Sequence, residues 1–192
     1  MELPKFPYHP NPLETGSIEE SDAACSCCGK ARGYIYTGPV YAEEELDDSL
    51  CPWCISDGSA NEKFGADFTD FDGIGGHGSW QEVSDDIKEM VVSRTPGFAS
   101  SEDKWWTHCS DAAEFIGYAG AEEVKEYGAD LITSIGDDLG LAGQELSTFI
   151  ESLDIEGGAT AYVFRCRKCG RIGGYADEVG LEESEDEAAD EE

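Results

Sequence analysis

The chain has 192 residues, 40% of them hydrophobic, and it carries 12 basic against 43 acidic side chains. This composition is typical of a globular protein and excludes a chain that is disordered throughout, while the acidic excess disfavours nucleic acids and anionic membranes as partners. No run of 18 apolar residues occurs, and residues 1–12 do not combine a basic segment with an apolar stretch, so we expect a cytoplasmic protein with neither a membrane span nor a signal peptide.

The N-terminal segment, residues 1–20, is predicted to be an extended arm. It contains four of the seven prolines, which are incompatible with a helix interior. Phe6 and Tyr8 are candidate anchors, either onto the body of the protein or onto a partner. His9 is expected at the surface or in a capping role, in preference to a role as a ligand.

The first cysteine-rich part, residues 21–65, predicts a metal site. A reducing compartment keeps thiols free, so eight cysteines that include three Cys-x-x-Cys pairs favour metal ligands over disulfides. Gly29 closes the first pair as in a zinc knuckle, and the sequence then predicts short strands at 34–37 and 40–42 and a helix over 55–64. This order is typical of a treble-clef-like site, in which one tetrahedral zinc is held by four thiolates: Cys25, Cys28, Cys51 and Cys54. The adjacent Cys27 remains an alternative to Cys28.

The middle of the chain, residues 83–155, is predicted to be helical and follows a glycine-rich loop. Apolar residues recur there at helical spacing, and Ser84 and Pro96 mark a start and a stop for the first helix. The expected helices span 84–93, 101–108, 121–128 and 143–153. Their apolar faces are core candidates.

The C-terminal part, residues 159–176, is predicted to be a β-hairpin with a second glycine-closed knuckle at Cys166 and Cys169. A second zinc at this knuckle needs two further ligands, which Cys109 and either His108 or His77 can supply. Four bases surround the knuckle, and we interpret them as charges that offset metal thiolates rather than as a nucleic-acid patch: Arg165, Arg167, Lys168 and Arg171.

The fold class expected from these parts is α+β. Residues 21–176 are expected to form a single compact body. Residues 177–192 hold ten carboxylates and no base, so we expect a disordered acidic tail there.

Six segments carry a resemblance to a known family. They are LPKFPYHPNPLETG at 3–16, YIYTGPVYAEEEL at 34–46 after the first cysteines, LCPWCISDGSANEKF at 50–64, RTPGF at 94–98, HCSDAAEFIG at 108–117 and TAYVFRCRKCG at 160–170. Together they resemble the CbrC family of bacterial proteins, named for a member linked to colicin tolerance. The resemblance implies a small cytoplasmic protein of unassigned molecular activity. Family members often have a further cysteine where this chain has Ala112 and Ala113.

Three classes of function are compatible with these features. We favour a zinc-stabilised protein-interaction module, linked to colicin tolerance or a stress response, because a closed four-ligand site leaves no position for a substrate. One alternative is an enzyme, either thiol-redox at Cys51 and Cys54 or zinc-dependent through an open site at Cys109, Cys166 and Cys169. The other is a protein that binds nucleic acid or imitates it to occupy a nuclease. No catalytic residue can be named, since the three histidines fit no triad motif.

Overall fold

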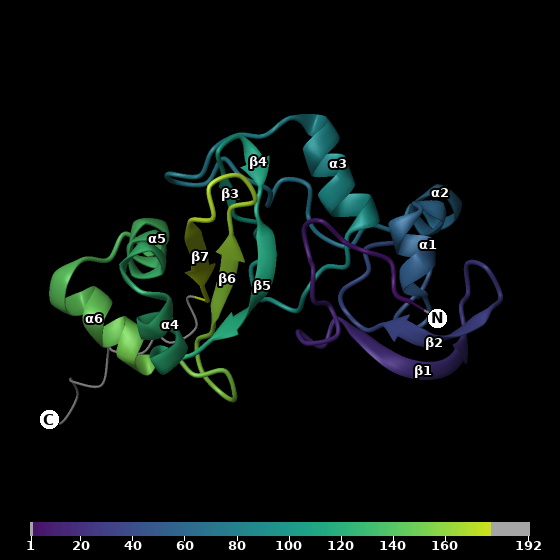
Figure 1. Ribbon diagram of the computed structural model, residues 1–192, viewed down its shortest axis with the longest axis horizontal. Helices are drawn as coiled ribbons and strands as arrows, with labels where there is room; N and C mark the ends of the chain where they lie inside the picture. The colour runs from purple at the N-terminus through teal and green to yellow at the C-terminus, as the bar shows by residue number, and fades with distance from the viewer. Residues whose placement is uncertain (1, 178–192) are drawn as a thin grey trace, which may run out of the picture.

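The computed structural model describes residues 2–177 and has, within that range, six helices and seven strands (Figure 1). All three sheets are antiparallel: two have two strands each, and the third has the order β5-β6-β7. The elements are β1 (Ile18–Ala24), β2 (Ala31–Tyr36), α1 (Pro52–Ser56), α2 (Ser59–Phe64), α3 (Asp85–Arg94), β3 (Thr107–His108), β4 (Asp111–Ala112), β5 (Glu114–Ala119), α4 (Ala121–Tyr127), α5 (Ala129–Leu139), α6 (Gly143–Ser152), β6 (Ala161–Arg165) and β7 (Ile172–Ala176). The predicted α+β class is confirmed. The part predicted to be helical contains β3, β4 and β5 as well as its helices.

The N-terminal hairpin differs from the predicted one. Strand β2 pairs with β1, and the first knuckle lies at the tip between them. The strand predicted at 40–42 is wrong, because Tyr41 makes only an isolated bridge with Asp67. Strand β1 was missed because Ile18 is its one buried residue, so its sequence lacks the alternation that signals a half-buried strand.

The N-terminal arm packs against the rest of the protein. Phe6 and Tyr8 are 3% and 7% exposed, and they belong to two different hydrophobic cores. The surface position predicted for His9 is wrong, since its ring is fully buried between the carbonyl oxygen of Pro96 and the hydroxyl of Thr15, at 2.8 and 2.7 Å. The arm therefore fastens the two cores to each other.

The three-stranded sheet is buried on both faces, which explains the continuous apolar run of β6. Ala161 and Val163 point toward the helices α4, α5 and α6, whereas Tyr162 and Phe164 join an aromatic core on the other face. Figure 1 shows these three helices gathered beside β7.

Helix α5 was not predicted, although its sequence carries a helical signal. Leu131 and Ile135 are fully buried one turn apart, and α5 lies against β7. The Ser134 hydroxyl donates a hydrogen bond to the Gly174 carbonyl at 2.7 Å and accepts one from its amide at 3.0 Å. The helix is thereby fixed to the strand through both backbone groups of one glycine.

The helix predicted over 101–108 is wrong. The amide of Trp105 donates to the Gly73 carbonyl at 2.9 Å, and the Trp105 carbonyl accepts from the Gly75 amide at 3.2 Å. This segment is therefore extended beside the glycine-rich loop, and its end forms β3. The helix predicted over 55–64 is divided into α1 and α2 at Gly58, whose φ of 81° is left-handed.

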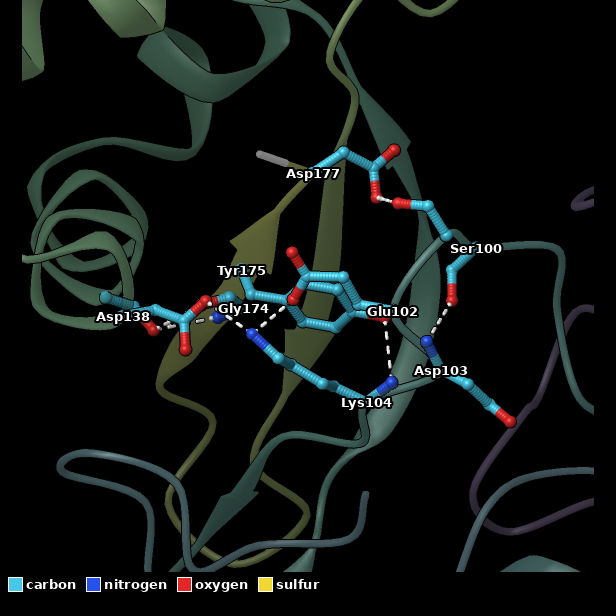
Figure 2. A network of polar contacts seen from close by, with 10 residues as sticks. Ser100, Glu102, Asp103, Lys104, Asp138, Gly174, Tyr175 and Asp177 are labelled. Carbon is cyan, nitrogen blue, oxygen red and sulfur yellow. Dashed lines mark hydrogen bonds and ion pairs between the residues drawn. The ribbon is translucent and has the colours of Figure 1, made fainter. Parts of the chain in front are cut away.

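A polar network joins the loop before β3 to α5 and β7 (Figure 2). The Lys104 ammonium pairs with Glu102 and, at 3.3 Å, with Asp138 on α5, and it lies over the ring of Tyr175. Burial opposes the charge on Lys104, but the two carboxylates outweigh it and raise the pKa of the ammonium. These contacts hold an otherwise irregular loop in place.

Asp177 belongs to the folded body and not to the acidic tail in which it was predicted. Its carboxylate accepts hydrogen bonds from the hydroxyls of Ser101 and Tyr162, the latter at 2.8 Å, and it is only 8% exposed. The rest of the predicted tail, 178–192, lies outside the described residues. The division into arm, body and tail otherwise stays a prediction. Among residues 2–177, no helix has the length and apolarity needed to cross a membrane.

Candidate metal centres

Four cysteines from two distant segments meet in the N-terminal half. Cluster 1 consists of Cys25, Cys28, Cys51 and Cys54. The first two lie at the tip of the β1–β2 hairpin, and the last two flank the start of α1. Their sulfur atoms all lie within 4.8 Å of one another, so the cluster can hold a metal ion.

The local backbone explains how the first pair is presented. The Cys25 amide donates to the Lys30 carbonyl at 3.1 Å, and the Gly29 amide donates back to the Cys25 carbonyl at 2.7 Å. This tight turn needs a left-handed residue after the second cysteine, and Gly29 supplies it with a φ of 69°. The Cys51 amide then donates to the Cys25 sulfur at 3.2 Å, which connects the two pairs directly.

The sulfur spacing fits a tetrahedral thiolate site. Zinc–sulfur bonds of about 2.3 Å place the sulfurs of a tetrahedron about 3.8 Å apart. The measured Sγ–Sγ distances are 3.6 Å for Cys51 and Cys54, 3.8 Å for Cys28 and Cys51, and 3.9 Å for Cys25 and Cys54. Cluster 1 therefore needs almost no rearrangement to surround such an ion.

The thiols of cluster 1 do not ionise equally. Burial opposes the Cys28 thiolate, but a backbone hydrogen bond from Lys30 and the neighbouring thiols lower its pKa to about 7. Burial, with the adjacent Cys25, raises the pKa of Cys51 to about 11. The Cys28 thiolate thus forms more readily at neutral pH than the Cys51 thiolate, which a neighbouring cation would stabilise.

The structure also distinguishes between the neighbours Cys27 and Cys28. Cys28 joins cluster 1, whereas the Cys27 sulfur lies 3.7 Å from the Ser59 hydroxyl and is not part of the group. A sequence cannot decide this, since it depends on which way each side chain of the turn points.

A second group of cysteine and histidine side chains meets beside the three-stranded sheet. Cluster 2 consists of His108, Cys109, Cys166 and Cys169, with all ligand atoms within 4.8 Å of one another, and it too can hold a metal ion. His108 ends β3, Cys109 begins the β3–β4 turn, and the last two come from the β6–β7 knuckle. The alternative histidine, His77, lies instead against the ring of Trp80.

The two knuckles share one backbone pattern. The Cys166 amide donates to the Arg171 carbonyl at 2.8 Å, and the Gly170 amide donates to the Cys166 carbonyl at 2.9 Å, with a φ of 76° at the glycine. These bonds join the same relative positions as in the first knuckle. The shared Cys-x-x-Cys-Gly sequence therefore gives the same turn at both ends of the protein.

The partner turn is strained. Cys109 and Ser110 both have positive φ angles, of 57° and 55°, in a two-residue hairpin loop where glycine or asparagine is usual. The Lys168 ammonium donates to the carbonyls of both residues, at 2.9 and 3.3 Å, which ties the turn to the knuckle. This role of Lys168 is not predictable from the sequence, because nothing local in the sequence pairs residue 168 with residue 109.

The histidine of cluster 2 is held in place by stacking. The His108 ring lies parallel to the Trp106 ring at a centroid distance of 5.3 Å. Its Nδ1 atom is 3.2 Å from the Cys109 sulfur and 3.4 Å from that of Cys169. A tetrahedral zinc would separate nitrogen and sulfur by about 3.6 Å, so the ligands fit after shifts of a few tenths of an ångström.

The two clusters differ in their access to solvent. Cys25, Cys51 and Cys54 are at most 3% exposed, and Cys28 is partly buried. In cluster 2 only Cys166 is buried, whereas Cys169 is exposed. A polar cavity of about 270 Å³ borders cluster 2 and is lined by Trp106, His108, Asp137 and Arg171, among others.

The bases around the second knuckle are engaged by protein groups. Arg165 pairs with Glu114 at 3.2 Å, Arg167 with Asp111 at 3.3 Å, and Arg171 with Asp130 at 3.5 Å. Lys168 binds the carbonyls of the turn, as described above. Their positive charge is therefore largely balanced within the molecule.

Comparison with known proteins shows relatives across nearly the whole chain. UPF0167 proteins of Mycobacterium bovis and Mycobacterium tuberculosis are each 44% identical over 184 residues, which is 92% of this chain and 94% of each relative. A UPF0167 protein of Pseudomonas aeruginosa is 42% identical over 171 residues, or 88% of this chain and 93% of the relative. No solved structure matches significantly. The family profile described as "Uncharacterised protein family (UPF0167)" matches residues 3–178, and the chain therefore belongs to this family.

Proposed function

We propose that this protein is a zinc-stabilised protein-interaction module with two structural zinc sites. The observation that carries the proposal is the presence of two complete groups of four ligands, each with its ligand atoms within 4.8 Å. Sets of four cysteines, or of three cysteines and one histidine, are those in which proteins hold structural zinc. That zinc is the metal, and that these eight residues are its ligands, stays a prediction.

The geometry favours a structural over a catalytic role. A catalytic zinc keeps one position open for water or substrate, whereas His108 adds a fourth ligand to Cys109, Cys166 and Cys169. Cys51 and Cys54 likewise face two further thiols, which argues against an independent redox pair. Each cluster joins segments far apart in sequence, so each would act as a cross-link within the fold.

A protein partner is favoured over nucleic acid on electrostatic grounds. Residues 1–176 carry 33 acidic and 12 basic side chains, and the four bases around the second knuckle contact Glu114, Asp111, Asp130 and the carbonyls of the β3–β4 turn. Few bases are left to release counterions from a phosphate backbone. We infer a partner with a basic surface. Phe6 and Tyr8 are buried and do not supply the anchors.

The setting of this function follows from the sequence. We propose a cytoplasmic location, because two clusters of metal thiolates would be maintained by the reducing conditions of that compartment. The resemblance to the CbrC family supports a link to colicin tolerance or stress, as an association and not as a mechanism.

The test measures the metal content of the full-length protein and the coordination geometry of the bound metal. We expect two zinc ions per chain by elemental analysis, and spectra of four-coordinate sites rich in thiolate after replacement by cobalt. One metal per chain, or a five-coordinate spectrum that shifts on addition of azide, would contradict a pair of closed structural sites. A titration with duplex DNA is the control for the partner class, and tight, steeply salt-dependent binding would favour the nucleic-acid alternative.

A further inference from the structure

The unequal exposure of the two clusters has a chemical consequence. The oxidation of a cysteine follows its thiolate character and its accessibility. A metal-bound thiolate has the first property in either cluster, so accessibility decides between them. The geometry points to Cys169 as the site at which hydroperoxides oxidise this protein, with release of the metal from cluster 2 and retention of the metal in cluster 1. This inference rests on the proposed occupation of both clusters.

Cys169 is the residue of either cluster that an oxidant reaches first. It is exposed, whereas Cys28 and Cys109 are partly buried and the other cysteines of the two clusters are buried. The nearby cavity of about 270 Å³ is lined by polar groups and borders His108, so small polar molecules can approach the cluster from that side too.

A second cysteine lies close enough to Cys169 to form a disulfide with it. The sulfur atoms of Cys109 and Cys166 lie within 4.8 Å of the other ligand atoms of cluster 2. In the first step the Cys169 thiolate attacks hydrogen peroxide, an S–O bond forms, the O–O bond breaks and hydroxide leaves. In the second step the thiolate of Cys109 or Cys166 attacks this sulfur, an S–S bond forms, the S–O bond breaks and a second hydroxide leaves. Two electrons pass from the thiol pair to one peroxide, and two protons convert the hydroxides to water.

The reaction would expel the metal ion. A disulfide removes two of the three thiolates of cluster 2, and His108 with one remaining cysteine is too small a ligand set to retain the ion. If Cys166 is the partner, the β3–β4 turn stays attached to the knuckle by the Lys168 hydrogen bonds and the Arg167–Asp111 ion pair, whereas a disulfide to Cys109 would itself join the turn to the knuckle. Because Cys109 and Ser110 are held in left-handed conformations, loss of the metal also frees the turn to relax.

The experiment uses the full-length protein with its zinc content measured first. Hydrogen peroxide is added in equimolar amount, zinc release is followed with a chromogenic chelator, and the oxidised thiols are located by differential alkylation and mass spectrometry. We expect one of two zinc ions to leave at least about tenfold faster than the other, with a disulfide from Cys169 to Cys109 or Cys166. Release at equal rates, or first oxidation within cluster 1, would overturn the inference.

Two variants sharpen the test. Cys27→Ser removes a thiol that belongs to neither cluster, so the rate of the fast phase should not change. Cys169→His keeps four ligands but removes the exposed thiol, and it should retain both zinc ions and slow the fast phase severalfold. A wild-type rate in Cys169→His would overturn the assignment of Cys169. If the wild-type protein holds only one zinc before peroxide is added, the proposed function is contradicted. If the wild-type protein holds two zinc ions and releases both at the same rate, only this inference is contradicted.

Discussion

The backbone amide of Cys51 donates a hydrogen bond to the sulfur of Cys25 at 3.2 Å, across a separation of 26 residues. This bond places the start of α1 against the tip of the β1–β2 hairpin. The same contact brings the two cysteine pairs of cluster 1 together. Folding and metal binding are therefore expected to be coupled at cluster 1.

Cys54→Ser should remove one zinc per chain and lower the free energy of unfolding by on the order of 10 kcal/mol, because structural zinc contributes energies of that size to folding. Cys27→Ser is the matched control, since its sulfur faces Ser59, and it should leave both quantities nearly unchanged. Elemental analysis and urea denaturation measure the two effects. Full metal content in Cys54→Ser would show that the site is not the one described.

Asp177 is the last residue that the structure describes, and two hydrogen bonds hold its carboxylate in the fold. Asp177→Ala leaves the Tyr162 hydroxyl without its acceptor, and we expect a loss of about 1–3 kcal/mol. Asp177→Asn keeps an acceptor oxygen and should lose less, while deletion of residues 178–192 should change the melting temperature little. Thermal unfolding of the three proteins ranks their melting temperatures. A lower melting temperature for the deletion than for Asp177→Ala would refute this prediction.

Gly97 is required for close approach of two chain segments. A Cβ atom at this position would lie 1.9 Å from the Phe68 carbonyl oxygen, so Gly97→Ala should cost about 2–4 kcal/mol. A Cβ atom on Gly157 would meet no heavy atom within 4 Å, and Gly157→Ala should be nearly neutral. Chemical denaturation distinguishes them, and equal stabilities of the two variants would contradict the packing.

His9 should make the stability of the protein depend on pH. Burial lowers the pKa of the His9 imidazole to about 4, so the ring is neutral in the folded protein. The neutral ring donates a hydrogen bond from Nδ1 to the Pro96 carbonyl and accepts one at Nε2 from the Thr15 hydroxyl. The unfolded chain titrates near 6.5, so this contribution is complete above about pH 6.5 and is lost as the pH falls toward 4.

The expected loss from His9 is about 2 kcal/mol between pH 7.5 and pH 5. Because metal release also destabilises the protein in acid, the measurement compares wild type with His9→Gln by urea denaturation at both pH values. The variant should lose less stability on acidification. An identical loss in the two proteins would show that His9 does not titrate as described.

The local features of the two candidate metal centres follow from the sequence alone. Cys25 with Cys28, and Cys166 with Cys169, lie three residues apart and are each followed by a glycine, so the turn that aims them needs only neighbouring residues. The acidic surface and the α+β class likewise follow from composition and from the mixture of strand and helix patterns.

The tertiary structure decides what pairs with each knuckle. Whether His108 or His77 completes cluster 2 depends on a hairpin whose two central residues adopt left-handed conformations that their identities do not favour. The same holds for the predicted helix over 101–108, where Trp105 bonds to the glycine-rich loop instead of to its own neighbours. The burial of His9 is another example, since its partner Pro96 lies 87 residues away. Such contacts arise between segments that fold against each other, and short-range spacing in one segment carries no information about its distant partner.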